Sequence, residues 1–399
     1  MKKNLLWMAT ILVCCVSFFT SCSDDDDPVN PTPDEVEVQL QKMTLREKVG
    51  QMFYVRPECL DTTIHFNMQG GIDVSADDIT KIRLQAVNET MRKVNKDYPV
   101  GGIILYAHNI EDEAQLATFI PQIRALNGSP LLCIDEEGGR VARIGRNSNF
   151  NVETFESMEA IGKTGDPQNA YYCGNTIGTY LKKYDFDIDF APVADVNTNP
   201  ENIVIGARSF SNDPAVAAPM VTHYLQGLKD AGITGCIKHF PGHGDTKADT
   251  HFGYAQSMKT WDELLGCEMI TFKEGIDWGC QLIMTAHIAV PNVTDSNIPS
   301  TMSSIILQDK LRGELGYQNV IITDAMEMGA ITQQYNCAEA TVGCILAGVD
   351  IMLGPQNFVK AFDAVIEAVK NGTITEERIN QSVRRILKLR KYCKQAKSA

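Results

Sequence analysis

Positive charge is scarce in this sequence. The 399 residues include 36 lysines and arginines against 50 aspartates and glutamates, which gives a formal net charge of −14. An extended surface for nucleic acid is not expected, because an acidic protein and a phosphate backbone repel each other. We therefore predict no nucleic-acid partner and attribute the acidity to solubility.

The sequence also lacks the cysteine spacing of metal and redox sites. It has 12 cysteines but no CxxC pair, so neither a structural zinc site nor a redox motif is indicated. Cys14 and Cys15 lie in an N-terminal apolar run and Cys22 follows it, which leaves an odd number for the rest of the chain. We predict no disulfide framework, no bound metal and no cofactor.

The N-terminal apolar run is too short for a comfortable transmembrane span. Lys2 and Lys3 precede it, and small residues end it just before Cys22, which is the layout of a secretory signal over residues 1–21. Cys22 resembles the acylated cysteine of a bacterial lipobox. Residues 22–35 are acidic and then proline-rich, as in a tether. We expect an exported outer-membrane lipoprotein that faces the periplasm or the cell surface. The alternative is a cleaved signal followed by a plain linker.

From residue 36 onward, short apolar runs alternate with longer amphipathic stretches. Eight of these runs are strand candidates, and most are unbroken, as in parallel strands covered by helices: 51–55, 102–106, 131–135, 187–193, 233–238, 281–286, 319–323 and 349–353. The helical stretches are 76–94, 111–126, 157–184, 214–231, 260–279, 303–316, 338–347, 357–370 and 376–392. This alternation predicts a single α/β domain over 36–399, a (β/α)8 TIM-type barrel, with an open doubly wound sheet as the alternative.

A barrel of this kind places functional side chains just after its strands. The third predicted strand leads into Asp135, two glutamates and a Gly-Gly turn, where a carboxylate can reach a ligand with little obstruction. A solvated acidic turn is the alternative at this position. Arg208, beyond the fourth strand, could pair with an acidic group or donate to substrate oxygens.

Histidines gather after the fifth predicted strand. His239 and His243 have the i, i+4 spacing of some zinc pairs, but the Pro-Gly pair between them argues against a helix. An acid/base role fits better. Asp249 and His251 are two residues apart, so the carboxylate could orient the imidazole and raise its pKa.

Asp324 follows the seventh predicted strand directly. An ionised carboxylate at this place could attack the anomeric carbon of a sugar and form a covalent intermediate. The alternative is that Asp324 caps the N-terminus of the following helix. His287, after the sixth strand, is a weaker candidate that could line a pocket.

Four motifs, taken together, resemble the glycoside hydrolases of family 3, and most closely the bacterial β-N-acetylglucosaminidase branch. They stand in the same order and on the same strands as in that family, and the resemblance extends from about residue 45 to residue 389: Asp135-Glu136-Glu137-Gly138-Gly139-Arg140, Lys238-His239-Phe240-Pro241-Gly242-His243-Gly244, Asp249-Thr250-His251 and Thr323-Asp324.

The resemblance implies a retaining double displacement that releases terminal β-linked N-acetylglucosamine from glycans or peptidoglycan fragments. Asp324 would be the nucleophile, and His251 the general acid/base, tuned by Asp249. A further set of residues would bind the hydroxyls of the terminal sugar: Asp135, Arg208, Lys238 and His239. A histidine departs from the usual pair of carboxylates. Similar family 3 β-glucosidases take their acid/base from a second domain, whereas here only a short helical tail follows the eighth strand.

Two residues depart from the branch pattern. Glu136 stands where glutamine is usual, and Thr250 stands where serine is common, which leaves the fine specificity for substrate open rather than the reaction class. Two other functions compete with the favoured one. The first is a family 3 β-glycosidase or phosphorylase of different specificity, and the second is a non-catalytic glycan-binding lipoprotein.

Overall fold

The fold is a barrel of parallel strands, in a computed structural model that describes residues 34–64, 83–247 and 255–398. Eight strands pair side by side in the order β10-β1-β2-β3-β4-β5-β7-β9. A parallel bridge between Ile322 and Ile351 joins the two ends of this order, so the sheet closes on itself. The predicted (β/α)8 barrel is confirmed, and the open doubly wound sheet is excluded.

Each of the eight predicted strands is present. They are β1 (Phe53–Val55), β2 (Gly102–Leu105), β3 (Leu131–Ile134), β4 (Ile188–Asp189), β5 (Thr234–Phe240), β7 (Leu282–Thr285), β9 (Val320–Thr323) and β10 (Met352–Leu353). All residues of these strands are buried, which explains why most of their positions are apolar. A small parallel pair, β6 (Ala255–Gln256) with β8 (Ile288–Ala289), was not predicted.

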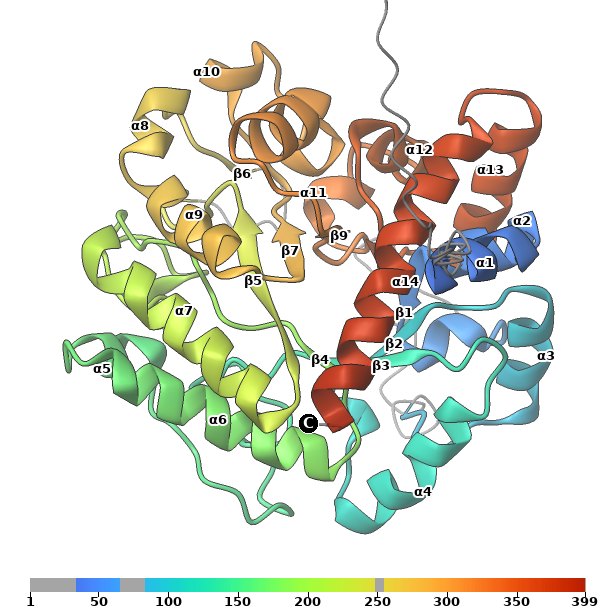
Figure 1. Cartoon of the computed structure of the whole chain (residues 1–399), viewed down its shortest axis with the longest axis horizontal. Helices are drawn as coiled ribbons and strands as arrows, with labels where there is room; N and C mark the ends of the chain where they lie inside the picture. The colour runs from blue at the N-terminus through green and yellow to red at the C-terminus, as the bar shows by residue number, and fades with distance from the viewer. Residues whose placement is uncertain (1–33, 65–82, 248–254, 399) are drawn as a thin grey trace, which may run out of the picture.

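Helices surround the barrel (Figure 1). The longer ones are α1 (Glu35–Lys42), α2 (Leu45–Gln51), α3 (Glu89–Asp97), α4 (Glu113–Arg124), α6 (Pro167–Lys183), α7 (Pro214–Ala231), α9 (Glu268–Trp278), α12 (Cys337–Ala347), α13 (Phe358–Lys370) and α14 (Glu376–Ser398). The shorter ones are α5 (Met158–Gly162), α8 (Trp261–Leu265), α10 (Pro291–Thr294) and α11 (Gly329–Thr332). Short 3-10 turns are η1 (Pro57–Leu60), η3 (Ala107–Asn109), η4 (Gly206–Arg208) and η5 (Ser300–Met302).

Several predicted helices differ from those observed. The stretch 157–184 is two helices, α5 and α6, because Gly165 adopts a φ of +68° and Pro167 starts a new helix at its first turn. The stretch 260–279 also divides, into α8 and α9, and η6 (Ile305–Glu314) is a π-helix. Residues 83–88 are not helical, so the described part of the predicted 76–94 helix begins only at Glu89.

Helix α14 lies across the N-terminal mouth of the barrel. Its side chains donate hydrogen bonds to carbonyls just before five strands: Arg390 to Gly101 and Ser129, Lys397 to Asp185, Arg385 to Gln318 and Arg378 to Val349. Figure 1 shows α14 crossing in front of the strands. Helix α1 packs along it, with Glu35 paired to Lys391 at 2.8 Å. The mouth at this end is therefore closed, which leaves the opposite end for a site.

Several predictions concern residues outside the described ranges. These are the signal peptide 1–21, Cys22 and nearly all of the tether, together with Asp249 and His251 of the proposed acid/base pair. Within the described ranges, the nine cysteines are free. None of the helices described for this chain has the length and apolar character that a membrane crossing requires.

Candidate active site

Charged and polar side chains converge where the strands end, opposite α14. Asp135 follows β3 directly, and Asp324 follows β9. Lys238 and His239 are among the last three residues of β5. In a parallel barrel these C-terminal ends meet around one axis. The structure thus brings together side chains that lie almost 190 residues apart in the sequence.

Glu137 is the centre of a buried ion cluster. Its carboxylate accepts two hydrogen bonds from the Arg208 guanidinium, at 2.8 Å and 2.7 Å, and lies 2.6 Å from the Lys238 ammonium. Burial by itself would raise the pKa of Glu137, but Arg208 and Lys238 hold that pKa well below its usual range. Only 1% of Glu137 is exposed, so it orients the two cations rather than meeting a ligand itself.

Asp135 is the second anion of this cluster and is more accessible. One carboxylate oxygen is 3.0 Å from the Lys238 ammonium, and the other is 3.2 Å from the Arg143 guanidinium. Burial opposes ionisation, but Lys238 and Arg143 keep the pKa of Asp135 below its ordinary value. The side chain of Asp135 is 16% exposed to solvent. Asp135 can therefore accept hydrogen bonds from ligand hydroxyls while the cations keep it ionised.

Asp195 holds the turn that follows β5. One of its oxygens accepts from Nδ1 of His239 at 2.6 Å, and the other accepts from the backbone N–H of His243 at 2.6 Å. Nε2 of His239 lies 3.3 Å from the Arg208 guanidinium, which can only donate. His239 therefore carries its proton on Nδ1, and its ring is fixed from both sides.

His239 and His243 do not form the arrangement of a metal pair. Their ring centroids are 6.2 Å apart, and Nδ1 of each ring is engaged, one with Asp195 and the other with Thr246 at 2.7 Å. No group of three His, Cys, Asp or Glu side chains with the arrangement of a metal site occurs in the ranges that the structure describes. Both rings are thus held in place through Nδ1, and neither is arranged for a shared metal ion.

Asp324 stands at the end of β9 and does not cap a helix. Its carboxylate accepts from the N–H of Ala325 at 2.8 Å, and the next helix, α11, has Met328 as its N-cap. The alternative that Asp324 is an N-cap is therefore wrong. Burial lowers the pKa of His243 to about 4, and the opposing charges include Asp195 and Asp324. The charge of Asp324 acts on His243, in keeping with the position of both residues at the C-terminal end of the barrel.

His287 supports the turn that holds Asp324. It is 1% exposed, with Nε2 donating to the Ala325 carbonyl at 3.1 Å and Nδ1 2.9 Å from the Thr301 hydroxyl. Thr301 in turn donates to the carbonyl of Ala286 at 2.9 Å. His287 was predicted as a candidate for lining a pocket, but the structure places it behind the reacting end, where it fixes the backbone.

Glu136 points away from the cluster of Asp135 and Glu137. Its carboxylate accepts from the backbone N–H groups of residues 143, 144 and 145 at 2.5, 3.0 and 2.7 Å, and from the Tyr180 hydroxyl at 2.8 Å. Glutamine would place an amide donor among these four donors. Since Glu136 is fully buried, its departure from the family pattern concerns this turn rather than direct contact with a substrate.

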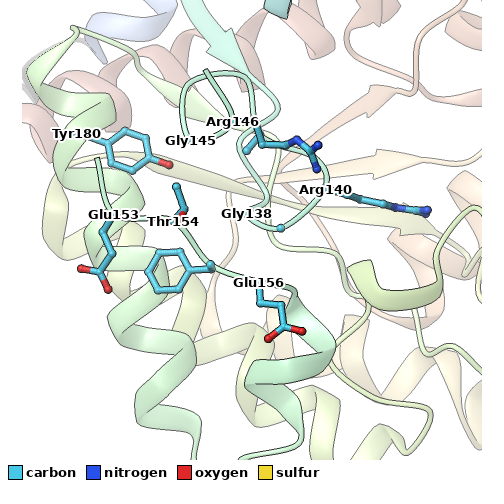
Figure 2. Close-up of a pocket in the computed structure, with 11 residues that line it drawn as sticks. Gly138, Arg140, Gly145, Arg146, Glu153, Thr154, Glu156 and Tyr180 are labelled. Atoms are coloured by element: carbon cyan, nitrogen blue, oxygen red, sulfur yellow. The ribbon is translucent and has the colours of Figure 1, made fainter. Parts of the chain in front are cut away.

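A cavity of about 390 Å³ lies on the outer side of that turn (Figure 2). Gly138, Gly145 and Tyr180 form part of its wall, and Figure 2 shows the Tyr180 hydroxyl pointing toward the loop. Other lining residues include Arg140, Arg146, Glu153 and Glu156. None of the predicted site residues lines this cavity, so it is separate from the ion cluster.

The charges of the site balance. Asp135, Glu137 and Asp195 offset Lys238, Arg143 and Arg208, and these groups are joined by direct ion pairs or through His239. Buried carboxylates need such partners, since an unpaired buried charge is strongly destabilising. Fixed donors and acceptors at one place suit a ligand with several hydroxyl groups, while Asp324 adds a further carboxylate that can react.

Replacement of Glu137 by glutamine is expected to lower the free energy of unfolding by about 3 kcal/mol at pH 7, because Lys238 and Arg208 lose their buried counter-charge. The pKa of Glu137 is depressed in the folded state. The ionised Glu137 carboxylate therefore stabilises the fold fully above pH 4.3, about its pKa in the unfolded chain. This stabilisation is lost as the pH falls toward the lower pKa of Glu137 in the folded protein. Thermal unfolding of both proteins between pH 3 and pH 7 should show a difference that shrinks in acid.

The exposed Glu274 provides the matched control, since Glu274→Gln should leave the unfolding temperature unchanged over the same pH range. A Glu137→Gln difference that stayed constant, or grew, as the pH fell would contradict the role given to this carboxylate.

The sequence predicted some of these positions and missed others. Asp135, Arg208, Lys238 and His239 are brought into one network with Asp324 nearby, and Asp249 and His251 lie outside the described residues. The pairing roles of Glu137, Asp195 and Arg143 were missed. The position of Glu137 could have been predicted, because residues i and i+2 of an extended segment share a face. Glu137 therefore lies on the same face as Asp135, and Glu136 lies on the opposite face.

Comparison with known proteins places these observations in a family. Residues 44–389 match the profile described as "Glycosyl hydrolase family 3 N terminal domain". The chain is 34% identical over 322 residues to beta-hexosaminidase A of Pseudoalteromonas piscicida, an alignment that covers 73% of this chain and 53% of that protein. It is 32% identical over 287 residues to a beta-hexosaminidase of Tolumonas auensis, covering 70% of this chain and 82% of that one.

A solved structure gives the same result. A glycoside hydrolase family 3 beta-N-acetylglucosaminidase from Paenibacillus sp. strain FPU-7 superposes with a TM-score of 0.77 and 34% identity, over 90% of this chain and 64% of that one. The chain thus spans 53% of the Pseudoalteromonas protein and 64% of the Paenibacillus structure.

Proposed function

The chain belongs to glycosyl hydrolase family 3, and on that premise we propose that it is an exo-acting β-N-acetylhexosaminidase that releases terminal β-linked N-acetylglucosamine with retention of configuration. The observation that carries the proposal is that Asp324 and a cluster of fixed donors and acceptors lie at the same C-terminal end of the barrel. The names of the two beta-hexosaminidases support a hexosaminide as the substrate, and that of the Paenibacillus beta-N-acetylglucosaminidase supports N-acetylglucosamine as the sugar.

In the first step, the Asp324 carboxylate attacks the anomeric carbon. The bond from this carbon to the leaving oxygen breaks, and a covalent glycosyl ester forms on Asp324. The imidazolium of His251 gives its proton to the leaving oxygen, so the rest of the glycan departs as an alcohol.

In the second step, water attacks the same carbon from the opposite side. His251, now neutral, takes a proton from the water, and the bond to Asp324 breaks to regenerate the carboxylate. Asp249 would orient the imidazole and stabilise its protonated form. Asp135, Arg208, Lys238 and His239 would hold the sugar hydroxyls throughout, with the Asp135 carboxylate and Nε2 of His239 as acceptors and the two cations as donors.

The proposal is tested by assaying the full chain on defined β-glycosides and identifying the products. We expect fastest turnover of 4-nitrophenyl N-acetyl-β-glucosaminide and of the β-1,4-linked disaccharide of N-acetylglucosamine, with β-anomeric product seen first by NMR. Faster cleavage of β-glucoside or β-xyloside would overturn the substrate. A sugar 1-phosphate formed in phosphate buffer would indicate a phosphorylase, and sugar binding without turnover would indicate a non-catalytic protein.

We also propose that the chain is exported and anchored in the outer membrane through acylated Cys22. The basic, apolar and small-residue order of residues 1–22 supports this placement, and the acidic tether after Cys22 suits a barrel held off the lipid surface. The wild-type protein should sediment with the membrane fraction, and Cys22→Ala should abolish that association. Membrane association that survived Cys22→Ala would contradict lipid anchoring at this residue.

A further inference from the structure

The two ends of the segment 248–254 are tied to each other and to the barrel by side chains that the catalytic steps do not use. The upstream end runs from Phe240 to Lys247, and the downstream end begins with β6. We call the four tying residues the stem clamp: Asp245, Ser257, Lys259 and Glu268.

The first tie joins the ends directly. The Ser257 hydroxyl donates to the Asp245 carboxylate at 2.8 Å, across twelve positions of the sequence. Ser257 is 1% exposed, and its backbone N–H donates to the Ala289 carbonyl at 3.0 Å, which extends the pairing of β6 with β8. The downstream end is thereby fixed to the region that follows β7.

The second tie runs through Lys259. Its ammonium contacts the Glu268 carboxylate and lies 3.7 Å from the Asp245 carboxylate and 3.4 Å from the Thr198 hydroxyl. Burial alone would lower the pKa of Lys259, but Glu268 and Asp245 leave it above its usual range. Glu268 itself is fully buried at the start of α9. This ion pair is therefore shielded from solvent, where charge pairing is stronger than at a surface.

The upstream end also rests closely on the loop after β4. A Cβ added to Gly244 would lie 1.9 Å from the Val196 carbonyl oxygen, so this approach admits only glycine. The Gly244 carbonyl accepts from the backbone N–H of Asn199 at 3.1 Å. The Asn202 amide donates to the carbonyl of His243 at 2.7 Å. The upstream end is thus held on the loop after β4, and the downstream end is held on β8.

We propose that the stem clamp is a positioning device for the proton-transfer groups carried between the two ends. The inference rests on the proposed function, in which Asp249 and His251 act from residues 248–254. None of the four clamp residues has a hydrogen bond or ion pair, among those described, with the ion cluster that would bind the sugar. Their effect is exerted through the chain ends, whose separation and direction they fix.

The physical reason is the narrow tolerance of proton transfer. A donor must lie within hydrogen-bond reach of the leaving oxygen, and a displacement of about 1 Å costs on the order of 100-fold in rate. Loss of the hydrogen bond between Asp245 and Ser257 would allow the two described ends to move relative to each other. The sugar-binding groups and Asp324 stand on strand ends and would be unaffected.

The test compares leaving groups. In Asp245→Ala and in Ser257→Ala, kcat/KM for the β-1,4-linked disaccharide of N-acetylglucosamine should fall by about 30-fold. For 2,4-dinitrophenyl N-acetyl-β-glucosaminide, whose leaving group needs no proton, kcat/KM should fall by less than about 3-fold. The loss on the disaccharide should appear in kcat rather than in KM. Asp245→Asn, which keeps an acceptor oxygen for Ser257, should recover most of the loss.

Lys247→Ala is the matched control, because Lys247 lies between the clamp and the segment and pairs only with the exposed Glu201 among the described residues. It should change neither rate. Equal losses on both substrates in Asp245→Ala and Ser257→Ala would overturn the inference and indicate a merely structural role. Wild-type rates in these two variants would also overturn the inference but would leave the proposed function intact. A wild-type protein inactive on both substrates would instead overturn the proposed function, and this inference with it.

Discussion

Replacement of Asp324 by alanine is expected to reduce kcat/KM by about 10⁵-fold on every β-glycoside that the wild-type protein cleaves. Without the carboxylate no glycosyl ester can form, and this holds equally for good and poor leaving groups. The side chain is half-buried, and the turn that carries it is held separately by His287, whose Nε2 donates to the Ala325 carbonyl at 3.1 Å. Removal of the carboxylate should therefore leave the fold intact.

The measurement is steady-state kinetics of the purified variant with its thermal unfolding temperature beside it. Asp309→Ala, at an exposed position on η6, is the matched control and should keep full activity. Added azide should partly restore turnover of an activated substrate by Asp324→Ala and give the α-glycosyl azide, because azide then attacks in place of the carboxylate. Residual activity above about 1% of the wild-type value, with the fold intact, would remove Asp324 from the role of nucleophile.

The second large effect belongs to His251. His251→Ala should lower kcat/KM by about 10³-fold on the β-1,4-linked disaccharide but by less than about 10-fold on the dinitrophenyl glycoside, since only the former needs a proton on its leaving oxygen. Asp249→Ala should show the same pattern with a smaller loss. Azide should raise kcat of His251→Ala on the activated substrate and give the β-glycosyl azide, because the glycosyl ester forms but its hydrolysis is slow.

His223→Ala is the control for His251, because His223 lies on α7 with Nδ1 bonded to the Pro219 carbonyl at 2.8 Å. It should not change the ratio between the two substrates. If His251→Ala lost no more activity on the disaccharide than on the dinitrophenyl sugar, the proton donor would have to be sought elsewhere in the barrel.

The strands were predictable because of where they lie. A strand buried on both faces is apolar at most of its positions, as in Val320–Thr323, where only the last residue is polar. The helix breaks were less visible. Gly165 and Pro167 stop one helix and start another within three residues, whereas amphipathic periodicity continues across them. The short pair β6–β8 could not be predicted, because two residues carry no periodicity.

The site was predictable as a set of strand ends but not as a network. Asp135, Lys238 and Asp324 each follow or end an apolar run, so the barrel alone brings them together. The bond between Glu137 and Arg208 spans 71 residues and depends on how the loop after β4 folds back over β3. Such a pairing is a long-range contact that local sequence patterns do not encode.

The helix across the N-terminal mouth also bears on how the chain is made. Helix α1 is the first described element and α14 is the last, yet they pack on each other, and α14 bonds to residues just before five of the strands. During translation, α14 is synthesised more than 300 residues after α1, so the packing between these two helices can form only at the end. The N-terminal mouth of a nascent barrel would stay accessible to chaperones, or to other nascent chains, until residues 376–398 leave the ribosome.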